Sequence, residues 1–261
     1  MTHMHGKSAE PRILYAGDDD LDRAAQYLGS VLHDAGYSFD YIPSSERFPA
    51  SVDPTAYDLI ILSDYPSRQI DGRQREALAR AVRSGKVLLM IGGWESFHGM
   101  AGEYAGTPIE DVLPVFLERS DDRRNLSQGC VVLPNGSSTF SRALDWEQPP
   151  VIGGFNAMTP RPDARIVLHG RPLIIRGTTD PVPLLAPSSV PLLVSASVGD
   201  GFAVALAFDL APHWVGGFVD WGLPRIGIRL NDQVAIEVGH EYRAFIRCLI
   251  RYCLSRGNDL P

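Results

Sequence analysis

The chain has 261 residues, of which 44% are hydrophobic and 21% are charged, and its formal net charge at pH 7 is -7. This composition is that of a globular protein with a sizeable core, and the acidic excess argues against binding to nucleic acid phosphates. No apolar run approaches the ~20 residues that a membrane helix needs, and residues 1–10 lack the apolar stretch of a signal peptide. We therefore expect a cytoplasmic protein that binds neither nucleic acid nor a membrane.

The first hundred residues alternate between short apolar strands and amphipathic helices. We expect helices at residues 21–35 and 71–83, and strands at residues 12–16, 38–42, 58–62 and 87–91. Most of these strands are apolar on both faces, which is typical of a parallel sheet covered by helices on both sides. The sequence thus predicts an α/β fold with a mainly parallel sheet.

The middle of the chain has a different character. Residues 102–190 contain many prolines and few helical patterns, so we expect a β-rich elaboration packed on the sheet. Its short strands are predicted at residues 112–117, 129–133, 164–168 and 172–175. Two apolar strands follow at 191–197 and 201–209, joined by a tight turn at 199–201, and an amphipathic helix is predicted at 241–254. We expect one domain over residues 1–261, with residues 1–10 as a flexible tail.

Three scattered cysteines, Cys130, Cys248 and Cys253, lack the spacing of a disulfide framework, a zinc site or a redox motif. We expect all three to be reduced residues of the core. We expect no bound metal ion and no cofactor.

Ligands of an open parallel sheet gather beyond the carboxyl ends of its strands. The segments at these ends are residues 17–20, 63–66, 92–97 and 210–214. The third of them begins with Gly92 and Gly93, which allow a sharp turn, and a helix after the turn would point its free N–H groups at a bound group. This arrangement resembles a nucleophile elbow, but Trp94 stands where the nucleophile would be. We expect Ser96 to cap the helix and Trp94 to cover the pocket.

His213 is the second candidate, because it follows a strand in Ala211-Pro212-His213-Trp214. It can act as a general base or orient a ligand, or it can be a histidine packed between Trp214 and Trp221. Either Asp209 or Asp220 could orient it, and the sequence does not choose between them.

Several acidic residues also follow the strands. Asp18 begins a cluster with Asp19, Asp20 and Asp22 that could bind a hard cation, although capping of the next helix is the favoured interpretation. Asp64 ends another strand and could face the pocket. The run at residues 121–124, DDRR, is interpreted as a solvated loop or a local set of ion pairs.

Three segments together resemble a known family: IGGWESFHG at residues 91–99, GTPIEDVLPV at 106–115, and APHW at 211–214. They are similar to the class I glutamine amidotransferase-like proteins, in the branch near the trehalose-utilisation-type (ThuA-like) proteins. Residues 121–123 and 152–156 fall where that branch has comparable segments. The resemblance implies a flavodoxin-like α/β core over nearly the whole chain.

The resemblance also implies a catalytic pattern that this chain does not keep. Class I amidotransferases use an elbow cysteine, a histidine, and a glutamate two residues beyond that histidine. The matching residues here are Trp94, His213 and Val215. Without an elbow thiolate the thioester route to ammonia is closed, so we predict that the protein is not a glutaminase.

Three functions remain open from the sequence. The first is binding of a small polar metabolite, with a sugar as one candidate, and its expected ligand-binding residues are Gly92, Gly93, Trp94, His98, Asp64, Asp18 and Trp214. The second is a hydrolase that uses Ser96 or a water molecule together with His213 and Glu95. The third is a structural module, in which Trp214 and Trp221 form the interface of a homodimer or higher homo-oligomer.

Overall fold

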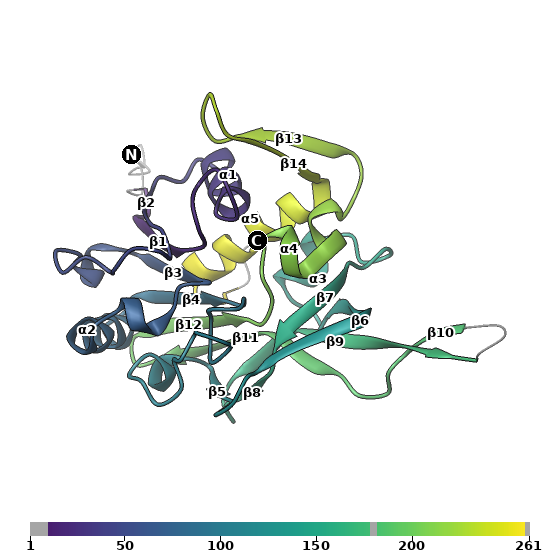
Figure 1. Ribbon diagram of the computed structural model, residues 1–261, viewed down its shortest axis with the longest axis horizontal. Helices are drawn as coiled ribbons and strands as arrows, with labels where there is room; N and C mark the ends of the chain where they lie inside the picture. Colours follow the sequence, from purple (N-terminus) through teal and green to yellow (C-terminus); the bar gives the residue numbers. More distant parts are fainter. Residues whose placement is uncertain (1–9, 178–181, 259–261) are drawn as a thin grey trace, which may run out of the picture.

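The computed structural model describes residues 10–177 and 182–258. Within these residues, ten strands form one mixed sheet (Figure 1). Five neighbouring strands are parallel, in the order β2 (Phe39–Ile42), β1 (Ile13–Gly17), β3 (Leu59–Ser63), β4 (Val87–Ile91) and β12 (Gly201–Leu206). The sheet continues with antiparallel strands β11 (Val190–Val198), β9 (Arg165–Arg176), β6 (Arg123–Pro134) and β7 (Val151–Asn156), and β10 (Val182–Leu185) pairs with β9.

The apolar strands predicted in the first half of the chain are confirmed, with small shifts at their ends. All five residues of β1, of β3 and of β4 are buried. Each of these strands lies between two other strands, and the rest of the chain covers both faces of the sheet there. The predicted hairpin is also confirmed, since β11 and β12 pair antiparallel across Gly199 and Asp200. The fold is therefore a mixed α/β fold whose sheet has parallel strands from the β2 edge to β12 and antiparallel strands beyond it.

Three longer helices pack on the sheet. The first predicted helix is shorter than expected: α1 spans Gln26–Asp34, and residues 21–25 form a turn before it. Helix α2 (Gly72–Arg83) starts at a capping box formed by Asp71 and Gln74. Helix α5 (His240–Leu254) packs against α1, β4 and β12. Its predicted inward face is confirmed, since Phe245, Ile246, Leu249, Ile250 and Cys253 are all buried.

The strands predicted in the middle of the chain are longer or shorter than expected. The pieces at 164–168 and 172–175 are one strand, β9, and the piece at 129–133 is part of β6, because pairing between long strands continues through locally weak segments. Residues Glu110–Val112 form a 3₁₀ turn (η3), so the next strand, β5, covers only Val115–Leu117 and pairs with β8 (Met158–Pro160).

Several short elements were not predicted. The hairpin of β13 (Arg225–Arg229) and β14 (Ala235–Gly239) exposes about every second residue and offers little apolar pattern. The other unpredicted short elements are strands β7, β8 and β10, helices α3 (Thr139–Ala143) and α4 (Pro212–Val215), and the 3₁₀ turns η1 (Pro54–Ala56), η2 (Ser67–Gln69) and η4 (Gly216–Asp220).

The core agrees with the interpretation of the cysteines. Cys130, Cys248 and Cys253 are buried free thiols. Aromatic rings fill the space under α5, where Phe218 lies 5.2 Å from Phe208 and 5.2 Å from Phe245, measured between ring centroids. Among the residues described, no helix has the length and apolarity to cross a bilayer.

Candidate functional site

The turn after β4 depends on its two glycines. A Cβ atom on Gly92 would lie 2.5 Å from the backbone of Ala207, and a Cβ atom on Gly93 would lie 2.3 Å from Oδ1 of Asp64. Both distances are far below van der Waals contact, so only glycine lets the end of β4 run between these neighbours. The predicted sharp turn is confirmed.

The helix predicted after this turn is absent. Residues 92–109 form successive turns and bends, and Phe97, Gly99 and Glu103 have left-handed backbone angles that interrupt a right-handed helix. The backbone N–H groups of His98 and Gly99 donate to the carboxylate of Asp122 rather than to carbonyls of a preceding helical turn. The expectation that helical N–H groups face a ligand here is therefore wrong.

Ser96 consequently caps no helix. Its hydroxyl donates to the carbonyl of Ile91 at 2.5 Å and accepts the N–H of Asp64 at 2.9 Å, and its exposed fraction is 1%. The side chain ties the end of β4 to the end of β3. A hydroxyl with both roles filled inside the chain is poorly placed to attack a substrate.

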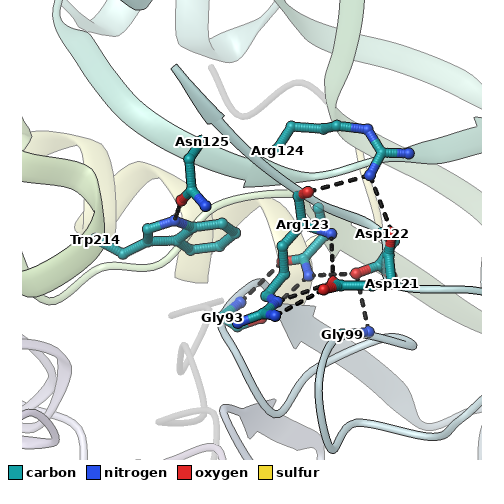
Figure 2. Close-up of polar contacts among 9 residues, drawn as sticks. Gly93, Gly99, Asp121, Asp122, Arg123, Arg124, Asn125 and Trp214 are labelled. Carbon is teal, nitrogen blue, oxygen red and sulfur yellow. Dashed lines mark hydrogen bonds and ion pairs between the residues drawn. The ribbon is translucent and has the colours of Figure 1, made fainter. Parts of the chain in front are cut away.

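A buried polar network holds the same turn from the other side (Figure 2). The amide of Asn156 accepts from the N–H of Gly93 at 2.9 Å and donates to Oδ1 of Asp122 at 2.8 Å. Asp122 is fully buried, so its interpretation as part of a solvated loop is wrong. The reason is tertiary: β6 begins beside the turn and presents this carboxylate to its N–H groups.

The two tryptophans of the predicted site have different environments. Trp94 is exposed, and the guanidinium of Arg123 lies over its ring at 4.6 Å. Trp214 is buried, and its indole N–H donates to Asn125 at 2.7 Å (Figure 2). Its ring fills the space beside Gly154, where a Cβ atom would lie 2.2 Å from Nε1. Trp214 is therefore a packing residue.

A cavity of about 370 Å³ opens at the carboxyl ends of the parallel strands. We call it the acidic cavity. Its lining combines carboxylates and a histidine with apolar surface: Asp18, Asp19, Arg23, Ala24, Gln26, Tyr27, Ser44, Asp64, Glu95, Ala211, Pro212 and His213. Four of the predicted site residues thus meet here, namely Asp18, Asp64, Glu95 and His213. The others, Gly92, Gly93, Trp94, Ser96, His98 and Trp214, do not line it.

The partner of His213 is Asp209. Nε2 of His213 lies 2.9 Å from Oδ2 of Asp209, which is buried three residues beyond the end of β12, whereas Asp220 pairs with Arg225. The hydrogen bond and the charge of Asp209 raise the pKa of His213 to about 9, despite partial desolvation that acts the other way. Glu95 is held by an ion pair with Arg68 at 2.9 Å.

Two further carboxylates are crowded into this site. Burial, and then repulsion from Asp209, raise the pKa of Asp18 to about 7. The same two causes raise the pKa of Asp64 well above its ordinary value. Asp18 and Asp64 also have left-handed backbone angles at the ends of β1 and β3, a conformation that non-glycine residues adopt mainly at special positions.

A larger cavity, of about 450 Å³, lies between α3 and α5. Its lining includes Arg243 and Arg247, both of which pair with Asp34. It lies away from the strand ends and contains no carboxylate. We therefore place the candidate site in the smaller, acidic cavity.

The pKa of His213 gives a direct test of this geometry. An NMR titration of the imidazole should give a pKa near 9, and Asp209→Asn should lower it toward the ordinary 6.5, because the first cause of the shift is removed. The raised folded-state pKa means that the pair stabilises the fold below about pH 6.5 and that this contribution is lost as pH rises through about 9. An unchanged pKa in Asp209→Asn would contradict the assignment, and His213→Gln identifies the resonance.

Comparison with known proteins agrees with this architecture. Residues 15–226 match the family described as "Putative glutamine amidotransferase" (GATase1_like). The chain belongs to this family. No curated protein matches the sequence of this chain.

Solved structures share the fold. A cytoplasmic protein, STM1381, from Salmonella typhimurium LT2 is 23% identical, with a TM-score of 0.70 over 95% of this chain and 100% of that one. A second cytoplasmic protein, STM3548, from Salmonella typhimurium is also 23% identical, with a TM-score of 0.66 over 92% of this chain and 98% of that one. A cold-adapted β-galactosidase from Rahnella sp. R3 is 12% identical, with a TM-score of 0.51, and the match spans 91% of this chain but 30% of that enzyme. At these identities the likeness concerns the fold alone.

Proposed function

We propose that this member of the glutamine amidotransferase-like family does not hydrolyse glutamine and instead binds a small polar ligand in the acidic cavity. The observation that carries the proposal is the convergence of Asp18, Asp64 and His213 on one cavity at the strand ends. Its volume of about 370 Å³ falls within the about 300–1,000 Å³ that small-molecule sites occupy.

The thiols of the chain support the first half of the proposal. None of the cysteines lines the acidic cavity. Burial raises the pKa of Cys130 to about 11 and that of Cys248 to about 12, and it raises the pKa of Cys253 further. A thiolate nucleophile at neutral pH is therefore disfavoured at all three positions. Trp94 and Val215 stand where the amidotransferase pattern has the elbow cysteine and the glutamate.

The charges of the cavity determine which ligands it favours. Carboxylates accept hydrogen bonds, so they suit the hydroxyl groups of a sugar or polyol, or a cationic amine. An anionic metabolite is disfavoured, because the N–H of Gly93 already donates to Asn156 and the N–H of Glu95 already donates to Asp64. A neutral sugar or polyol and a cationic amine are thus the candidate ligands.

Thermal-shift measurements test the binding function. A ligand at about 100 times its Kd stabilises the native state by about 2.7 kcal/mol, which corresponds to a Tm increase of several degrees. We expect neutral sugars, polyols or amines to raise Tm and sugar phosphates to have no effect. The shift should disappear in Asp64→Asn and persist in Asp20→Asn, which changes an exposed carboxylate outside the cavity. No shift across the panel, or turnover of glutamine to glutamate and ammonia, would contradict the proposal.

Hydrolysis is the second candidate function. His213 paired with the buried Asp209 can activate a water molecule as a general base once its imidazole is deprotonated, and because its pKa is raised to about 9, this activity should increase with pH up to about 9. Water rather than Ser96 is the nucleophile in this scheme, because the hydroxyl of Ser96 already donates to the carbonyl of Ile91. Glu95 stays in its ion pair with Arg68. If an ester or glycoside substrate is turned over, His213→Gln should reduce kcat by about 100-fold or more.

An interface built on the tryptophan pair is not supported, since Trp214 and Trp221 are each only 7% exposed. Homo-oligomerisation itself remains a prediction, and the hairpin of β9 and β10, which projects from the sheet with Val182, Leu184 and Leu185 exposed, favours it (Figure 1). Light scattering, which gives the molar mass in solution, tests the homo-oligomer.

We also propose a single flavodoxin-like domain, membership of the ThuA-like branch and a cytoplasmic location, the last supported by the two Salmonella proteins.

A further inference from the structure

Three side chains come together at the acidic cavity: Asp64 and His213 line it, and Asp209 contacts His213. A ligand atom from each of Asp64, Asp209 and His213 lies within 4.8 Å of the other two. Nε2 of His213 and Oδ2 of Asp209 are 2.9 Å apart. Two atoms bound to one ion at about 2.1 Å are about 3.0 Å apart at right angles and about 4.2 Å apart on opposite sides. The separation between His213 and Asp209 therefore matches that of two adjacent ligands of one ion, and Asp64 lies near enough to become the third after a small side-chain movement.

A fourth carboxylate points to the same need for a cation. Asp18 is only 6% exposed and lines the same cavity. Oδ2 accepts from the hydroxyl of Tyr15, and Oδ1 makes no hydrogen bond of normal geometry with a described residue, although the hydroxyl of Ser63 is near enough to lower the pKa of this carboxyl group. A buried carboxylate oxygen without a donor is costly unless the carboxyl group is protonated or a cation compensates its charge.

The surrounding charges do not supply that compensation. Within the described part of the chain, no lysine or arginine forms an ion pair with Asp18, Asp64 or Asp209, and Arg23 at the cavity rim pairs with Asp19 at 4.0 Å. His213 offers at most one positive charge against these three carboxylates. A divalent ion would relieve the repulsion that remains.

We propose that Asp64, Asp209 and His213 bind a divalent first-row transition-metal ion, with Asp18 beside it as a charge-compensating carboxylate. This inference rests on the proposed function, because the metal would lie in the ligand cavity. An imidazole nitrogen among carboxylate oxygens favours ions such as Co²⁺, Mn²⁺ or Zn²⁺ over Ca²⁺ or Mg²⁺, which prefer oxygen ligands alone.

Titration with Co²⁺ tests the assignment. The full chain should carry His3→Ala and His5→Ala, so that the N-terminal histidines do not bind metal, and should be treated with a chelator and then titrated by calorimetry and visible absorption. We expect one equivalent of Co²⁺ to bind, with an absorption band that reports a nitrogen ligand. His213→Gln, whose side chain is half exposed and should not disturb folding, and Asp209→Asn should each weaken binding by at least about tenfold. Asp20→Asn should leave it unchanged.

Two results would overturn the proposal: no saturable binding at one equivalent, or equal binding by the parent and by both His213→Gln and Asp209→Asn. A response to Mg²⁺ or Ca²⁺ without a response to Co²⁺ would also overturn the choice of ion. The sugar and polyol panel, repeated on metal-free protein, separates this inference from the function it rests on. Ligand binding without Co²⁺ binding removes the metal site alone, and Co²⁺ binding without any ligand removes the small-molecule function alone.

Discussion

Replacing Asp122 with alanine should destabilise the protein by about 3 kcal/mol. The carboxylate is fully buried and accepts the N–H groups of His98 and Gly99, each at 2.9 Å, and the amide of Asn156 at 2.8 Å. Alanine leaves these donors buried without partners, and each such donor costs about 1–3 kcal/mol. Urea denaturation should show a lower midpoint with an unchanged slope.

The adjacent aspartate provides a matched control. Asp121 is exposed, and its side chain pairs with Arg123 at the surface. Asp121→Ala should therefore cost less than about 1 kcal/mol. Equal effects of the two substitutions would show that the polar network does not hold the turn after β4.

Gly92→Ala should be comparably damaging, for a steric reason. The added Cβ atom would lie 2.5 Å from both the carbonyl carbon and oxygen of Ala207, and 2.7 Å from Oδ1 of Asn156. Backbone atoms inside the sheet cannot move away cheaply, so β4 and β12 must separate. Overpacking of this kind costs about 3 kcal/mol, and we expect a lower Tm with weakened ligand binding in the acidic cavity.

Gly72→Ala is the control for the general effect of replacing a glycine. A Cβ atom there meets nothing within 4 Å at the start of α2. The stability should change by no more than about 1 kcal/mol, and toward stabilisation, because alanine restricts the unfolded chain. Tolerance of alanine at Gly92 would contradict the proposed role of the turn.

The sequence indicated the strand-end segments of the site but not which of their side chains meet. Asp18, Asp64 and His213 were named because each follows an apolar strand, and they do line one cavity. Trp94, Ser96 and His98 were named because of their position after Gly93, and they do not. Their directions depend on the path of residues 94–109, which the likeness to a nucleophile elbow wrongly predicted to begin as a helix.

The sequence alone determined the elements whose stability is local or comes from an unmistakable apolar pattern. These are strands β1, β3, β4 and β12, the capped helix α2, the apolar face of α5, and the glycine turn after β4. Only the tertiary structure decided what depends on partners distant in the chain. Asp209 rather than Asp220 reaches His213, Asp122 enters the turn from the start of β6, and β9 continues through two weak segments. Such hydrogen bonds and pairings form between residues that only the order of the strands brings together, so no local pattern encodes them.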